Sequence, residues 1–282
     1  MKEDYLLIGV DLKDQFAVRF LSLGHALETS LELHKPGSDL ARLYAEFVLG
    51  SVLLGSRMDE QQATLYKLKF EDPKLTINCE VAPQGAFRSA IFPPENKDDE
   101  LKKAPHQLCI VLLKQKDDVY ESYIEVDSKD VSENFQNYLN KSVQTDAIIW
   151  VHVDLDNLKN SFGVWVERLP TTTQEVWDQW SQALKQKDHF LKSFSKTDDP
   201  DKILKNLFLE PIRILAVTKP SLLCSCNKER IIGALKLLPE ADLVEIFMDN
   251  KGVETVCDYC HKVWSIEDAE IQAILKMKSI LH

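Results

Sequence analysis

Six cysteines occur in the chain, and four of them fall in two close pairs. One residue separates Cys224 from Cys226, two separate Cys257 from Cys260, and 30 residues lie between the pairs. Four thiolates can complete a tetrahedral zinc site, and C-x-x-C is a common half of such a site. The spacing therefore predicts one Zn²⁺ per chain, held by Cys224, Cys226, Cys257 and Cys260.

The segment that carries these cysteines, residues 220–282, has few large apolar side chains. A unit of about 60 residues is marginally stable unless a metal or disulfides reinforce it. A zinc ion would supply that reinforcement. The simplest interpretation is a permanently closed zinc module that only holds the fold together.

The C-x-C pair favours a second interpretation. A disulfide between residues this close forms a small, strained ring, and strained disulfides are the readily reduced, regulatory kind. A zinc-bound thiol is deprotonated, and the thiolate is the form that oxidants attack. The four cysteines therefore also resemble a reversible redox switch, which binds zinc when it is reduced.

The remaining reactive residues form no second site. Cys79 and Cys109 lie in apolar runs with strand character, where a free cysteine is usually a small core residue. His261 follows Cys260 and could support or replace a ligand, but four cysteines already complete the site. The sequence has nine glycines and contains no glycine-rich phosphate loop, no G-x-S-x-G and no H-E-x-x-H. These absences argue against an ATP-driven machine, and we expect no enzymatic activity.

Composition narrows the possible partners. Acidic residues outnumber basic ones by 45 to 34, which gives a formal net charge of −11. Nucleic acids and anionic membranes both require a basic surface, so neither is expected as a partner. The most apolar stretch, residues 47–56, is far shorter than the roughly 20 residues of a spanning helix. The first residues also lack the pattern of a secretion signal, so we expect a cytoplasmic protein.

The elements that position the cysteines begin with a large N-terminal region. Helices are predicted near residues 40–48 and 128–142 from apolar residues at helical spacing. Runs of apolar residues, several of them alternating, predict strands at 15–23, 63–70, 74–81, 86–92, 107–113, 119–126, 147–155 and 161–169. Such an order predicts an α+β core domain over residues 1–170, built on an antiparallel or mixed sheet.

A linker is predicted over residues 171–219. Thr171–Thr173 offer an N-cap for a helix over 174–194. Its apolar stripe is interrupted by Lys187 and Asp188 and consists of Trp177, Trp180, Leu184, Leu191 and Phe194. A second helix is predicted after Pro200. The two helices either pack permanently on the sheet or dock in one state and are released in another, and periodicity does not separate these alternatives.

The last unit, residues 220–282, is predicted to contain three helices and a hairpin. Helices should begin at Asn227, after Pro239, and at Ser265, which is expected to cap the final one. A turn at 250–252 leads into a short strand, 253–256, and residues 263–264 should return antiparallel to it. The second cysteine pair then lies at the tip of this hairpin.

The cysteine motif resembles that of the heat-shock protein 33 family, the redox-regulated 33-kDa chaperonins. The similarity is strongest in Cys224-Ser-Cys226-Asn-Lys-Glu-Arg, followed 30 residues later by Cys257-Asp-Tyr-Cys260. Residues 132–144 and 163–170 are similar to stretches of the family's core domain. Where the family usually has a glycine-rich turn, this chain has Phe70-Glu71-Asp72-Pro73.

The resemblance implies a core domain, a helical linker and a zinc-binding redox-switch domain. It also implies an ATP-independent holdase that is inactive as a zinc-bound monomer. Oxidation would join Cys224 to Cys226 and Cys257 to Cys260, a pairing that also closes the shortest loops. Zinc would then be lost, the chain would dimerise, and unfolded or oxidatively damaged client proteins would bind.

Two other functions fit a four-cysteine unit. A zinc ribbon that binds nucleic acid or protein is one, but residues 219–282 carry 8 basic and 10 acidic side chains, which disfavours phosphate binding. A dithiol oxidoreductase that uses Cys257 and Cys260 is the other. Such motifs normally begin a helix, whereas residues 262–264 read as a strand.

Overall fold

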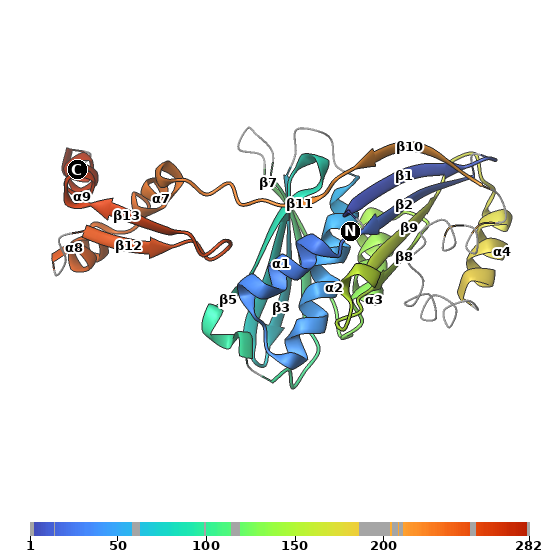
Figure 1. The fold of residues 1–282 in the computed structure, drawn as a ribbon, viewed down its shortest axis with the longest axis horizontal. Coiled ribbons are helices and arrows are strands. Elements are labelled where there is room, and N and C mark those ends of the chain that lie inside the picture. Colours follow the sequence, from blue (N-terminus) through green and yellow to red (C-terminus); the bar gives the residue numbers. More distant parts are fainter. Residues whose placement is uncertain are drawn as a thin grey trace. The chain divides into compact units, whose positions relative to one another are not determined.

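The computed structural model of the chain describes residues 3–13, 15–57, 63–98, 100–113, 119–185, 204, 208, 211–248 and 252–280. Contacts between Cα atoms divide it into two compact units, Met1–Leu223 and Cys224–His282. Helices and mixed sheets make both units α+β, as predicted (Figure 1). Among the residues named above, no helix combines the length and the apolar character needed to cross a membrane.

The first unit contains a five-stranded antiparallel sheet with the order β10-β1-β2-β9-β8. Its strands are β1 (Tyr5–Asp11), β2 (Phe16–Ser22), β8 (Ala147–His152), β9 (Phe162–Arg168) and β10 (Ile212–Thr218). Strands β8 and β9 form the hairpin expected between residues 147 and 169. Because β8 and β10 end the order, each has one edge without a neighbouring strand among the described residues.

A second sheet has six strands in the order β11-β5-β4-β3-β6-β7, and β11 is parallel to β5. The strands are β3 (Ala63–Glu71), β4 (Lys74–Val81), β5 (Ala86–Phe92), β6 (Gln107–Leu113), β7 (Val119–Glu125) and β11 (Ser221–Leu222). The predicted bounds of β4, β5 and β6 are confirmed to the residue. Alternation of buried and half-buried side chains in β3 and β4 explains this success.

The helix α2 (Ser38–Gly55) connects the two sheets through one core. Leu49 and Leu53 contact β9 at Gly163, where a Cβ atom would lie only 2.7 Å from Leu49, while Gly55 packs against Val81 of β4. The apolar run at 47–56 is therefore a helix that is buried on two sides. The other helical elements here are α1 (His25–His34), α3 (Val131–Tyr138), a π-helical turn (Leu139–Val143), and 3₁₀ turns at Pro83–Gly85, Pro94–Asp98 and Leu158–Asn160.

The opposite face of the five-stranded sheet is covered by α4 (Gln174–Lys185) (Figure 1). Trp177 and Leu184 are buried there, and the ring of Trp180 stacks on Phe16 of β2 with 4.5 Å between centroids. The ring of Phe208 also stacks on Trp180, with 5.6 Å between centroids. These contacts confirm the predicted stripe as far as Leu184. Its continuation at Leu191 and Phe194, the interruption at Lys187 and Asp188, and most of the second helix lie outside the described residues.

The segment predicted as linker, 171–219, also contains a strand of the core sheet. Strand β10 pairs with β1 through a register that includes Leu7↔Val217 and Val10↔Arg213. The compact units divide after Leu223, whereas the sequence placed boundaries at 170 and 219. The sequence places the apolar run of β10 in a helical linker because the segment before it is predicted to be helical.

The second unit contains α7 (Lys228–Leu235), α8 (Glu240–Met248), the hairpin of β12 (Gly252–Val256) and β13 (Val263–Glu267), and α9 (Asp268–Ile280). The turn predicted at 250–252 lies almost entirely outside the described residues. The prediction that Ser265 caps the last helix is wrong, because Ser265 pairs with Glu254 inside the hairpin. The helix begins at Asp268, three residues later, and the Glu270 carboxylate in its first turn accepts a hydrogen bond from the N–H of Glu267 at 2.9 Å.

Candidate metal centre

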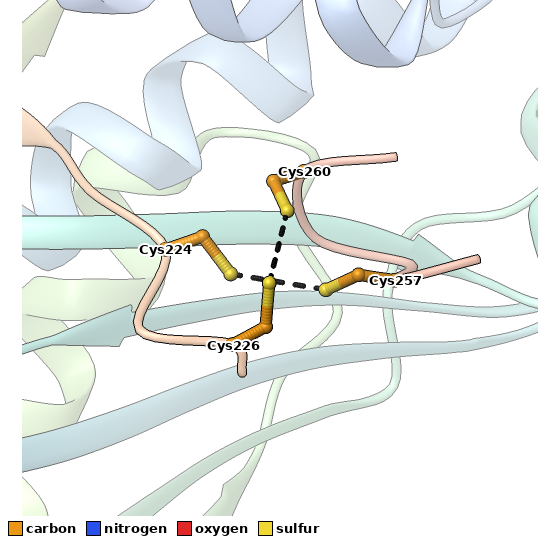
Figure 2. A group of neighbouring side chains, drawn as sticks. All are labelled: Cys224, Cys226, Cys257 and Cys260. Atoms are coloured by element: carbon orange, nitrogen blue, oxygen red, sulfur yellow. Dashed lines mark hydrogen bonds between the residues drawn. The ribbon is translucent and has the colours of Figure 1, made fainter. Parts of the chain in front are cut away.

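The four paired cysteines converge on one point within the second unit. Their sulfur atoms all lie within 4.8 Å of one another (Figure 2). The Sγ atoms of Cys224 and Cys257 are 3.8 Å apart, and those of Cys226 and Cys260 are 3.4 Å apart. The sequence prediction that folding brings C-x-C and C-x-x-C together is confirmed.

The donor set fits a tetrahedral zinc ion. At Zn–S distances of about 2.3 Å, the edges of a tetrahedron of sulfurs measure about 3.8 Å. The two measured separations match or fall slightly below that length. Four thiolates as the complete ligand set are typical of closed zinc sites.

The C-x-C loop is held by the start of α7. The Asn227 side chain accepts a hydrogen bond from the N–H of Arg230 at 2.8 Å and so caps the helix. The Arg230 guanidinium turns back and donates to the carbonyl of Ser225 at 3.3 Å and to its hydroxyl. Because Ser225 is the residue between the two cysteines, Arg230 fixes the loop that presents both sulfurs.

The C-x-x-C loop is the tip of the β12–β13 hairpin. The N–H of Cys257 donates to the carbonyl of Lys262 at 3.0 Å, and the N–H of His261 donates to the carbonyl of Cys257 at 2.7 Å. His261 has a φ of 55°, in the left-handed region that a tight turn requires. These bonds close the turn and direct both cysteines to the same side.

Burial makes the uncharged thiols the favoured form when no cation is present. Desolvation raises the pKa of Cys260 to about 12 and also raises the pKa of Cys257. Backbone N–H groups of residues 259, 260 and 262 act in the opposite direction and lower these pKa values in part. The same N–H groups are therefore placed to stabilise the thiolates that a metal ion would require.

The other residues singled out by the sequence lie elsewhere. Cys79 and Cys109 are fully buried in strands β4 and β6, which confirms their assignment to the core. Both belong to the first compact unit, whereas the four clustered cysteines belong to the second. His261 is exposed and does not belong to the group of four sulfurs.

Two supporting residues were not predicted. Arg230 appears in the sequence only as part of a family motif, and its contact with Ser225 becomes visible in the fold. Lys228 forms an ion pair of 2.7 Å with Glu270, which joins α7 to α9 within the second unit. A basic residue four to six positions after a C-x-C pair is the signal that would have suggested the first contact.

Comparisons with known proteins agree over nearly the whole chain. The family model described as "Hsp33 protein" matches residues 4–267. A 33 kDa chaperonin of Lactobacillus delbrueckii subsp. bulgaricus is 22% identical over 98% of both chains, and one of Streptococcus pyogenes serotype M49 is 28% identical over 57% of each. The crystal structure of a 33 kDa chaperonin from Thermotoga maritima superposes with a TM-score of 0.82, at 18% identity, over 99% of this chain and all of the other.

Proposed function

The chain belongs to the Hsp33 protein family, and from this premise we propose that it is a redox-regulated, ATP-independent holdase. In the reduced state it binds one Zn²⁺ through Cys224, Cys226, Cys257 and Cys260 and is inactive. In the oxidised state it binds unfolding or oxidatively damaged proteins and prevents their aggregation. It acts by binding and catalyses no reaction.

One observation carries this proposal. Four sulfurs from two loops meet within 4.8 Å, in a unit whose buried apolar side chains, among its described residues, are Leu243, Ile266, Ile271 and Ile274. Zinc bound there would cross-link the loops and keep the four thiols deprotonated. A core this small makes the fold of the unit dependent on that cross-link.

The oxidation step balances with peroxide as the oxidant. Two thiolates lose two electrons and form one S–S bond, while H₂O₂ accepts the electrons with two protons and leaves as two waters. Two such steps convert all four ligands, with Cys224 joined to Cys226 and Cys257 to Cys260. A disulfide sulfur is a poor metal ligand, so the oxidised chain no longer holds zinc.

Two sulfur contacts, of 3.8 Å between Cys224 and Cys257 and of 3.4 Å between Cys226 and Cys260, join the two loops. A bound metal ion would hold these pairs together and oppose separation of the loops. Loss of the metal allows that separation, and the short loops then close at the lowest cost in entropy. We expect the metal-binding unit to unfold in the same process.

Release of apolar surface would complete the switch. Helix α4 covers the sheet face formed by Phe16, Val18, Phe162 and Val164. An isolated helix of 12 residues is marginal in water, so α4 depends on this docking for its stability. We expect α4 to leave when the metal-binding unit unfolds, which would expose the sheet face to clients.

The assembly and location follow the same proposal. The reduced chain is expected to be a monomer and the oxidised chain a homodimer. A net charge of −11 disfavours nucleic acids and anionic membranes as partners, and the reduced state of a zinc–thiolate site suits the cytoplasm.

Aggregation of a heat-unfolded protein tests the function directly. We expect the reduced, zinc-loaded chain to have no effect on light scattering and the peroxide-treated chain to suppress it. Peptide mapping of the same sample should find the two disulfides within the loops. Equal activity in both states would contradict the redox switch, and a dominant bond between Cys226 and Cys257 would contradict the proposed pairing.

A further inference from the structure

A groove of about 1080 Å³ runs beside β8, the strand that ends the five-stranded sheet. Helix α3 and the segment before it line one side, and α4 lines the other. All lining residues belong to the first unit. The groove therefore exposes a sheet edge between two helices.

Side chains of α3 occupy the hydrogen-bonding groups of this edge. The Gln136 amide nitrogen donates to the carbonyl of Ala147 at 2.7 Å, and its oxygen accepts from the N–H of Ile149 at 3.2 Å. The Ser132 hydroxyl accepts from the N–H of Val151 at 2.9 Å. A side-chain amide has the same donor and acceptor as a peptide group, so Gln136 takes the place of a neighbouring strand.

Such an edge can pair with another chain if the covering side chains move. Unpaired strand edges are templates for extended polypeptides, and proteins usually cover them. Here the cover consists of two side chains on a helix surface. Rotation of these side chains costs far less than removal of a strand.

The charges of the groove select the kind of chain that fits. Carboxylates line it at Asp130, just before α3, at Glu133 of α3 and at Asp178 of α4. Asp146 also lines it but already forms an ion pair of 2.7 Å with Arg168. Arg42 is the one lysine or arginine among the described lining residues. Aromatic rings of Trp150, Phe162 and Trp177 line the same groove. Basic and apolar side chains on a bound segment would therefore find complementary groups.

We propose that this groove binds one extended segment of an unfolded protein, rich in lysine or arginine and in apolar residues, which pairs with β8 in place of Gln136 and Ser132. The inference rests on the proposed holdase function and names the chemistry of the client at one surface. Strand addition to a free sheet edge supplies affinity through the main chain and specificity through the side chains. Because β8 has six residues, the segment is about six residues long.

The hydrogen bonds of Gln136 to β8 are expected to keep the binding of a segment at this groove weak. A bound segment must replace hydrogen bonds that already exist, so the exchange contributes little net free energy. Removal of the competing amide should therefore strengthen binding. Truncation of an ordinary contact residue would have the opposite effect, which makes Gln136→Ala a decisive variant.

Fluorescence anisotropy on the reduced, zinc-loaded full chain tests the proposal. The probe is a labelled peptide of alternating lysine and valine. We expect Q136A to bind it about tenfold more tightly than the wild type, since one unopposed pair of hydrogen bonds is worth about that factor. Asn140→Ala is the matched control, because Asn140 lines the same groove and its side-chain oxygen accepts a hydrogen bond from the Gln136 amide at 3.0 Å.

Two further probes distinguish main-chain pairing with β8 from electrostatic attraction. A peptide with alternate N-methylated amides cannot pair with a strand and should not bind Q136A. A peptide of alternating glutamate and valine should bind at least about tenfold more weakly than the lysine peptide. Glu133→Lys in the Q136A background should weaken binding of the lysine peptide about fivefold. Glu32→Lys, on the exposed face of α1, should leave that binding unchanged.

Several results would overturn the proposal. These are no gain in Q136A, equal binding of basic and acidic peptides, or full binding of the N-methylated peptide. Dimerisation of Q136A in sedimentation without peptide binding would assign the edge to a second copy of the chain. The assay contains neither oxidant nor a client protein, so its failure is distinct from failure of the aggregation test.

Discussion

At the scale of single residues, burial and metal binding act in opposite directions on the thiols of Cys257 and Cys260. Burial raises the pKa of Cys260 to about 12, so the thiol resists ionisation when the site holds no cation. A divalent cation supplies the opposite charge and favours the thiolate. Contacts of Arg230 and of the β12–β13 turn hold the two loops that carry the sulfurs.

Replacing one half of the cluster should abolish metal binding. In Cys257→Ser/Cys260→Ser, two hard hydroxyl oxygens replace thiolates, and a two-ligand remnant holds zinc poorly. We expect the zinc content measured by atomic emission to fall from about one ion per chain to near zero. Cys79→Ala/Cys109→Ala should keep full zinc content, because these buried cysteines lie in the other unit. Retention of zinc by the first variant would contradict the ligand assignment.

Glu46 on α2 makes stability depend on pH. Burial, only partly offset by Arg42, raises the pKa of its carboxyl from 4.5 to about 7. The folded chain therefore binds more protons than the unfolded chain between these values, and its free energy of unfolding falls as pH rises through them. The loss amounts to about 3 kcal/mol between pH 4.5 and pH 7.

Glu46→Gln should remove that loss, because the amide stays neutral. Urea unfolding followed by tryptophan fluorescence at pH 5 and pH 8 measures it, since four of the five tryptophans lie before residue 224. The variant should gain stability relative to the wild type at pH 8. Glu32→Gln, on the exposed face of α1, should leave the pH dependence of the wild type unchanged. A parallel pH dependence in E46Q would refute the assignment.

At the scale of elements, α4 is the part whose position decides activity in the proposed switch. Trp177 is 6% exposed, and its ring centroid lies 6.0 Å from that of Phe16. Trp180 is half-buried, and its ring stacks on the rings of Phe16 and Phe208. These rings provide much of the apolar contact between α4 and the sheet. The exposed face of the same helix carries polar residues such as Gln179.

Trp177→Ala/Trp180→Ala should undock α4 without oxidation. Loss of a buried tryptophan costs about 3–5 kcal/mol, and the half-buried ring adds less. We expect the reduced variant to suppress aggregation while the reduced wild type does not, and its α4 amides to exchange hydrogen faster. Gln179→Ala is the control and should stay inactive. A variant with rapid exchange in α4 and no holdase activity would show that α4 does not cover the client surface.

The sequence predicted those elements whose signals are local. Strands β4, β5 and β6 alternate or are continuously apolar between polar turns, and the helices of the metal-binding unit follow Asn227 and Pro239. Helix α1 was missed because its cap is not local. The Asp4 carboxylate accepts hydrogen bonds from the N–H groups of Gly24, His25 and Ala26, about 20 residues away. Strand β1, which carries no polar alternation in Tyr5–Val10, was missed as well.

The metal centre was predictable to a greater extent than its surroundings. Ligand identity follows from spacing, since C-x-C and C-x-x-C restrict which sulfurs can meet. The Arg230–Ser225 contact depends on the orientation of α7, and the Gln136 cover of β8 depends on how α3 crosses a sheet edge. Side-chain contacts of this kind require the three-dimensional register that periodicity does not contain.

At the scale of the whole molecule, two units of unequal size differ in what stabilises them. The first has a continuous core that joins α2 to both sheets. The second buries few apolar side chains among its described residues and brings four cysteines together. We therefore expect the stability of the second unit, and not that of the first, to depend on the metal.

Removing zinc from the full reduced chain with a chelator should unfold the second unit and leave the core around α2 folded. Binding free energy at a structural zinc site is folding free energy for a unit this small. We expect hydrogen-exchange protection to vanish in α7 and α9 and to persist in α2, and calorimetry to retain the main transition. Readdition of Zn²⁺ should restore protection. Loss of protection throughout α2 would show that the two units fold as one.

The short strand β11 has a mechanical consequence. The chain leaves the five-stranded sheet after β10, joins β5 of the other sheet at Ser221 and Leu222, and reaches Cys224 after one more residue. The N–H of Leu223 also donates to the carbonyl of Phe87 at 2.8 Å. Tension exerted by the unfolded segment after Leu223 would thus load a two-residue parallel pairing before it reached β10. This short pairing would therefore break first, and the five-stranded sheet would stay intact.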